Sequence, residues 1–115
     1  MPYIRVTRRF PRKPAAVPVE LRVLGEAEPF EDSLTTKVLG LGGCCVVSPE
    51  PLGFASLLYL KLDFPDRSVR ADGRVAYELA KDGGYEVGVE FLRLMPRDRA
   101  WLEEVVTGPS TGPVN

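Results

Sequence analysis

The feature that most constrains the fold is a series of short segments in which apolar and polar side chains alternate. In one of them Leu58, Leu60 and Leu62 alternate with Tyr59 and Lys61. Successive side chains of a strand point to opposite faces, so this pattern predicts strands with one buried face. Six such segments are predicted, at residues 17–23, 35–41, 44–48, 57–64, 69–79 and 85–92. Six strands at this spacing predict an all-β fold, a six-stranded antiparallel β-barrel.

The phase of the alternation also predicts a core. The side chains expected inside include Leu21, Leu60, Val75, Val89 and Phe91. In the fifth segment, Tyr77 and Leu79 share the inward face with Val75 by simple alternation.

Glycine pairs mark the reversals between these segments. Gly42-Gly43 is expected to turn the chain between the second and third strands, because glycine tolerates positive φ without steric cost. Gly83-Gly84, after Asp82, is expected to close a hairpin between the last two strands.

With 115 residues the chain has room for one domain with one modest core. Residues 1–16 are expected to form a flexible basic arm, residues 17–106 the barrel with a short C-terminal helix, and residues 107–115 a disordered tail. Pro96 suits the first position of that helix, and Trp101 is expected to cap the barrel.

The net charge of −1 conceals an uneven distribution. Residues 1–13 carry five basic side chains and no acid, which leaves ten basic against sixteen acidic residues, a charge of −6, in the remainder. A basic arm on an acidic body favours a local phosphate partner over general attraction to nucleic acid. A solvated basic tail without a ligand is the alternative.

Two motifs in the chain resemble those of the PilZ family. Arg8-Arg9-Phe10-Pro11-Arg12 matches the family's R-x-x-x-R motif. The family's D/N-x-S-x-x-G motif is only partly present: with its glycine at Gly43, Val38 replaces the Asp or Asn and Gly40 replaces the Ser. The resemblance spans roughly residues 5–106. It implies a small β-barrel in which Arg8, Arg9 and Arg12 contact cyclic di-GMP and positions 38, 40 and 43 lie at its guanine edge.

The chemistry of those arginines fits such a ligand, because a guanidinium pairs with phosphate through two hydrogen bonds and stacks on flat purines. The losses at Val38 and Gly40 remove polar partners that are worth roughly 1 to 3 kcal/mol each. Thr35 or Thr36 is a candidate replacement for the missing hydroxyl, and the amides of Gly42 and Gly43 for anion contacts.

The composition argues against an enzyme. The chain has no histidine, so the commonest general base and zinc ligand are both missing. The adjacent Cys44 and Cys45 are expected on opposite faces of a strand, which argues against a shared metal or a disulfide between them. No catalytic residue, metal site or cofactor is therefore predicted.

The leading hypothesis is a PilZ-like regulatory module that binds cyclic di-GMP and acts on a protein partner. The first alternative is a PilZ-like adaptor that has lost the nucleotide and works in pilus, motility or polysaccharide control. Nucleic-acid binding ranks third, because few aromatic side chains are expected to be exposed and the body is acidic. A cytoplasmic location is expected, without membrane insertion, since no apolar run approaches the roughly 20 residues that span a bilayer.

Overall fold

A computed structural model describes residues 12–25 and 31–107, and the statements below concern those residues. They form seven strands and one helix. The elements are β1 (Arg12–Pro14), β2 (Pro18–Val23), β3 (Glu31–Gly40), β4 (Gly43–Ser48), β5 (Leu57–Phe64), β6 (Arg67–Lys81), β7 (Gly84–Leu94) and α1 (Pro96–Thr107).

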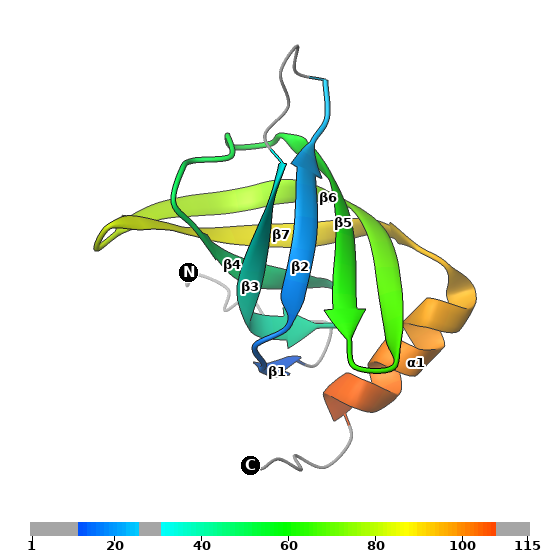
Figure 1. Ribbon diagram of the computed structural model, residues 1–115. Coiled ribbons are helices and arrows are strands. Elements are labelled where there is room, and N and C mark those ends of the chain that lie inside the picture. The colour runs from blue at the N-terminus through cyan, green and yellow to red at the C-terminus, as the bar shows by residue number, and fades with distance from the viewer. Residues whose placement is uncertain (1–11, 26–30, 108–115) are drawn as a thin grey trace, which may run out of the picture.

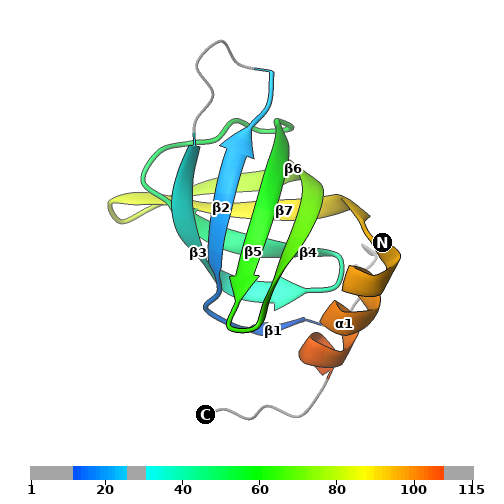
Figure 2. The same ribbon diagram turned by 45° about the vertical axis from the view of Figure 1, so that its right-hand side comes forward.

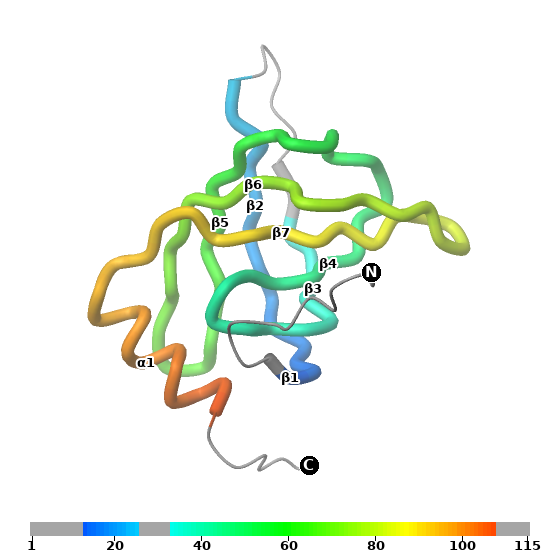
Figure 3. Tube along the Cα trace, turned by 180° about the vertical axis from the view of Figure 1, so that it is seen from behind, coloured from blue at the N-terminus to red at the C-terminus, as the bar shows by residue number. Residues whose placement is uncertain are grey.

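Six of the strands close into an antiparallel barrel, as the alternation predicted (Figure 1). The order around the barrel is β3-β2-β5-β6-β7-β4, and pairing of β4 with β3 closes it. Figure 3, seen from behind, shows β4 and β7 on the far side of the barrel from β2 and β5. The closed sheet places one face of every strand in a common interior.

The interior is filled by the aliphatic side chains that the alternation places there. Leu21, Leu60, Val75 and Val89 are buried, and Phe91 is partly buried against the same core. The predicted phases of these strands are thus confirmed at the centre of the barrel.

The second half of β6 departs from simple alternation. The register between β6 and β7 shifts between Val75 and Tyr77, which inserts Ala76 as a bulge residue. A bulge residue moves the following side chains to the other face. Tyr77 and Leu79 are therefore exposed, and their predicted inward placement was wrong.

The turn between β3 and β4 also differs from the prediction. Glycines with positive φ in the described residues are Gly25, Gly53 and Gly83, so neither Gly42 nor Gly43 uses that freedom. The reason for glycine at position 43 is instead the close approach of another strand, described below.

A strand occupies part of the predicted arm. Arg12–Pro14 pairs with β3, on the side of β3 that also carries β2. These three residues, two of them basic, show no alternation of apolar and polar side chains, so the sequence does not indicate a strand there. Residues 1–11 lie outside the described residues, as do 108–115 of the predicted tail.

The predicted C-terminal helix is present and covers one end of the barrel, beside the turn between β5 and β6 (Figure 2). Leu102 and Val106 are its buried residues. Trp101 meets the Phe64 ring edge-on, with centroids 4.7 Å apart, and the Arg67 guanidinium carbon lies 4.4 Å from the Trp101 ring centroid. Both contacts tie the helix to the ends of β5 and β6. The described part of the chain contains no helix with the length and apolar character needed to cross a membrane.

The two cysteines are free thiols on opposite faces of β4. Cys44 belongs to the barrel core, whereas Cys45 is covered on the outer side. The described residues contain no group of three or more side chains suited to hold a metal ion.

Burial makes the Cys44 thiol a weak acid, with a consequence for stability. Loss of solvation on burial raises the pKa of Cys44 from 9.0 to about 12. The unfolded chain therefore releases this proton first as the pH rises, so the thiol's contribution to stability is complete below about pH 9 and declines toward pH 12. Between about pH 8.5 and pH 10.5, we expect the free energy of unfolding to fall less for the Cys44→Val variant than for wild type. Urea unfolding at each pH measures it. Parallel pH profiles for the two proteins would contradict this expectation.

Candidate ligand site

The structure brings the end of the first motif beside the second. Arg12 pairs with Gly40, and Pro14 with Val38, in the register of β1 against β3. The predicted residues Arg8 and Arg9 lie outside the described residues, and of Arg12 the backbone is described. The strand register alone thus places the last arginine of R-x-x-x-R next to the position where the family has its serine.

The second motif runs from the end of β3 into the start of β4. Val38 pairs with Cys45 and lies half-buried on the outer side of the barrel, while Leu39 points into the core with Cys44. Gly40, two residues after Val38, is at the same face of the strand. The two positions where this chain departs from the family motif therefore lie side by side, and neither offers a polar side chain.

Thr36 holds the base of the arm against β3. Its hydroxyl donates a hydrogen bond to the Ala15 carbonyl at 2.5 Å and accepts one from the Val17 amide at 2.9 Å. The Ala15 amide in turn donates to the Lys37 carbonyl at 3.1 Å. The side chain of Thr36 is buried, so its hydroxyl is committed to the arm and does not replace the missing serine. Sequence patterns suggested a ligand contact at Thr36; the structure gives it an anchoring role.

Gly43, the glycine of the second motif, is needed for packing. An added Cβ there would lie 2.1 Å from the Val89 carbonyl oxygen and 3.1 Å from the Glu90 Cα. Such distances leave no room for any other residue. The neighbouring Gly42 carbonyl accepts a hydrogen bond from the Phe91 amide at 2.8 Å. This glycine pair therefore fixes the turn against β7.

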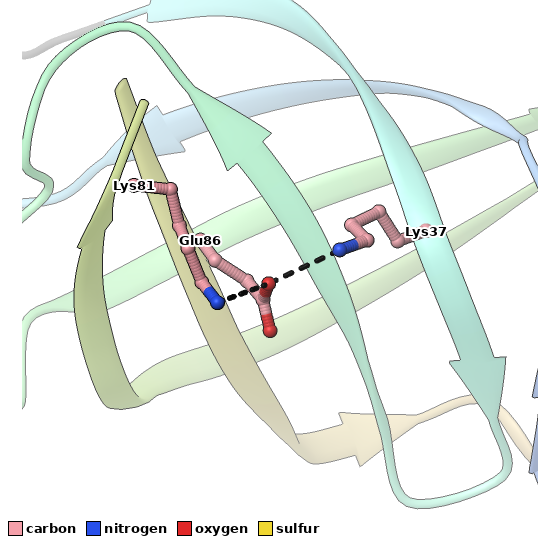
Figure 4. Close-up of polar contacts among 3 residues, drawn as sticks. All are labelled: Lys37, Lys81 and Glu86. Carbon is pink, nitrogen blue, oxygen red and sulfur yellow. Dashed lines mark hydrogen bonds and ion pairs between the residues drawn. The ribbon is translucent and has the colours of Figure 1, made fainter. Parts of the chain in front are cut away.

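A cluster of charges lies on the strands next to the motif (Figure 4). Oε1 of Glu86, on β7, forms ion pairs with Lys37 Nζ at 3.1 Å and with Lys81 Nζ at 3.9 Å. The hydrogen bond from Lys37 lowers the pKa of Glu86, which therefore stays ionised. Lys37 is the bulge residue of β3, directly before Val38. No sequence pattern indicates these three residues, because they are far apart in the chain and become neighbours only through the strand order.

A second ion pair lies beside Gly43. Gly43 pairs with Glu90 of β7 in the strand register. Arg74 of β6 donates two hydrogen bonds to one carboxylate oxygen of Glu90, from Nε at 3.2 Å and from Nη2 at 2.9 Å. This carboxylate is thus neutralised where it borders the motif. The carboxylates on both sides of the motif are paired with cations, so the surface is compatible with an anionic ligand.

The barrel, its N-terminal strand β1 and the glycine turn define a class of small β-barrel domains. A family model described as "PilZ domain" matches residues 7–108. The chain belongs to the PilZ domain family. A search of curated proteins found no match to this chain.

Solved structures share the fold. The Bacillus subtilis inhibitor of motility, MotI/DgrA, is 17% identical with a TM-score of 0.73 over 89% of this chain and 50% of that one. The PilZ domain of YcgR from Escherichia coli, solved with c-di-GMP, is 15% identical with a TM-score of 0.66 over 86% of this chain and 88% of that one. The K. pneumonia MrkH–c-di-GMP complex is 19% identical with a TM-score of 0.65 over 89% of this chain and 52% of that one. This chain therefore spans about half the length of MotI/DgrA and of MrkH.

Proposed function

We propose that this protein is a regulatory binding module whose ligand is cyclic di-GMP and which acts on a protein partner. The observation that carries the proposal is the register of β1 against β3, which sets Arg12 beside Gly40 and the second motif. Support comes from membership in the PilZ family and from two similar structures that hold c-di-GMP, those of YcgR and MrkH.

In this proposal the basic arm supplies most of the binding free energy. Guanidinium groups of Arg8, Arg9 and Arg12 pair with the phosphates and stack on the purines. The strand β1 and the Thr36 hydroxyl hold the base of the arm, which reduces the entropy lost when the arm closes on the ligand. Val38 and Gly40 offer no hydrogen bond to the guanine edge, so the affinity is lower than a complete motif would give.

Calorimetric titration with cyclic di-GMP tests the arm. We expect Arg12→Ala to weaken binding by about 1.5 to 3 kcal/mol, the usual contribution of a charged hydrogen bond, and added salt to weaken it further. Arg97→Ala, on the exposed side of α1, is the matched control and should bind as wild type does. Equal affinities for wild type and Arg12→Ala would show that the Arg12 side chain does not contribute to binding.

Restoring the second motif tests the rest of the site. The Val38→Asp/Gly40→Ser double variant should bind cyclic di-GMP more tightly than wild type, because it regains two polar partners for the guanine edge. Circular dichroism must first show that the variant is folded. A folded double variant that gives no heat with cyclic di-GMP would contradict the nucleotide hypothesis.

That outcome would favour a second candidate function, a PilZ adaptor that binds a protein without the nucleotide. Val38 and Gly40 are the observation in its favour, since both polar side chains of the second motif are missing. Under this alternative neither wild type nor Arg12→Ala gives heat on titration with a nucleotide, because no nucleotide binds.

A further inference from the structure

The outer face of β2, β5 and β6 carries exposed apolar side chains. In Figure 2 these three strands lie side by side toward the viewer. Leu57 and Tyr59 of β5 are 51% and 36% exposed. Leu24, which follows β2, is also exposed, and its amide donates to the Leu57 carbonyl at 2.9 Å. Leu24, Leu57 and Tyr59 are called here the apolar column.

The turn before β5 carries a further exposed aromatic side chain. Phe54 is 73% exposed, three residues before Leu57. Its turn is fixed by hydrogen bonds from the Ser56 amide to the Gly53 carbonyl at 3.1 Å and from the Ala55 amide to the Val75 carbonyl at 3.0 Å.

The conformation of this turn is costly. Ala55 has a φ of 70°, in the left-handed region that a residue with a Cβ seldom adopts. The carboxylate of Glu78 accepts hydrogen bonds from the amides of Leu52 and Gly53, which holds the loop in place. An exposed aromatic side chain on an ordered support is typical of the anchors that dominate protein interfaces.

The charges on either side of the apolar column form an alternating pattern. In one row across the strands, Arg22 of β2 and Asp72 of β6 flank Tyr59. In the next row, Glu20 and Arg70 flank Lys61. Each row therefore carries opposite signs at its two ends, and the signs are exchanged between the rows.

This pattern is complementary to itself. A two-fold axis parallel to β5 exchanges the β2 side of the face with the β6 side. Arg22 of one copy then lies opposite Asp72 of the second copy, and Glu20 opposite Arg70. Tyr59 meets Tyr59 at the centre, so its ring is covered, and the charges at the two ends of each row meet their complements. Lys61 meets Lys61 on the axis, where each ammonium group is paired within its own chain with Glu20 at 3.5 Å and Asp63 at 3.9 Å.

We propose that this face binds a second copy of the same chain to form a two-fold symmetric dimer. The proposal goes beyond cyclic di-GMP binding, because the face lies on β2, β5 and β6 whereas the motif residues of the candidate ligand site lie on β1, β3 and β4. The contacts that Asp72 and Glu20 make within their own chain are compatible with it. Asp72 accepts from Arg93 Nε at 3.1 Å and Glu20 lies 3.5 Å from Lys61 Nζ, and both pairs are exposed enough to accept a further partner.

Sedimentation equilibrium of the full chain without nucleotide, from micromolar to millimolar protein, tests the dimer. Wild type should show a concentration-dependent monomer–dimer equilibrium. Leu57→Asp should raise the dissociation constant at least about 30-fold, the effect of losing one interface anchor. Val47→Asp, an exposed position on β4 outside the face, is the matched control and should associate as wild type does. A wild type that stays monomeric throughout would overturn the proposal.

Charge reversal gives a sharper test of the two-fold geometry. Arg22→Asp and Asp72→Arg should each weaken self-association, because each sets like charges opposite one another twice in a symmetric dimer. An equimolar mixture of the two variants should form a heterodimer, since Asp at position 22 of one copy then meets Arg at position 72 of the other. Circular dichroism and cyclic di-GMP titration of each variant show whether fold and ligand site are retained. Failure of the mixture to associate, with both variants folded, would overturn this arrangement.

Discussion

Replacing Leu60 by alanine is expected to remove a large share of the stability of this domain. Leu60 is fully buried at the centre of β5, between β2 and β6. Truncation of a buried leucine costs about 2 to 5 kcal/mol, because both the buried methyl groups and their packing contacts are lost. Domains of this size have total stabilities of about 5 to 15 kcal/mol, so the variant should unfold at much lower urea concentration.

The matched control lies on the same strand. Leu57 is half exposed and points outward, so Leu57→Ala should change the free energy of unfolding by less than about 0.5 kcal/mol in dilute, monomeric protein. Urea unfolding followed by tryptophan fluorescence measures both variants. Similar losses at the two positions would mean that the inner and outer faces of β5 are wrongly assigned.

Gly43→Ala is the second substitution with a large expected effect. Its Cβ would lie 2.1 Å from the Val89 carbonyl oxygen, so the backbone of β4 or β7 must move. Forcing an extra methyl group into packed surroundings typically costs about 1 to 3 kcal/mol, and here the obstacle is main chain rather than a movable side chain. We expect a loss at the upper end of that range in urea unfolding, together with weakened pairing of β4 and β7.

Gly88 provides a contrasting case. A Cβ at this position would lie 2.1 Å from Cε2 of the Tyr77 ring, which is a side-chain obstacle. Gly88→Ala should therefore be destabilising in wild type but much less so in a Tyr77→Ala background. No side-chain removal should relieve Gly43→Ala in this way. A double-mutant cycle measures the difference, and equal costs of Gly88→Ala in both backgrounds would contradict the prediction.

The strands could be predicted from sequence because each has one face in a common core. Leu58, Leu60 and Leu62 alternate without interruption, and the structure keeps that phase along β5. The closed barrel and the helix at Pro96 followed from the number and spacing of such segments.

Bulges and short strands could not be predicted in the same way. The bulge residues Lys37 and Ala76 are set by how two strands pair, which no single segment encodes. The strand β1 forms because β3 extends beyond β2 and offers hydrogen-bond partners to residues 12–14. Its own three residues carry no pattern that would indicate this.

The candidate site was predictable in outline. The motif spacing correctly placed Val38, Gly40 and Gly43 around one turn, and the register adds Arg12 beside them. The role of Thr36 depends on two main-chain groups more than fifteen residues away in sequence, Ala15 and Val17. Such contacts become visible only when the fold is known. The placements of Arg8 and Arg9 remain predictions.

The order of strands around the barrel has a kinetic consequence. β2 pairs with β5, β4 pairs with β7, and α1 packs against β1 and β3 near the other end of the chain. Few of these contacts can form before long segments of chain have been brought together, and chains dominated by distant pairings fold slowly. We therefore expect folding on the millisecond-to-second scale typical of β-barrels, with α1 docking only after β3 has found its partners.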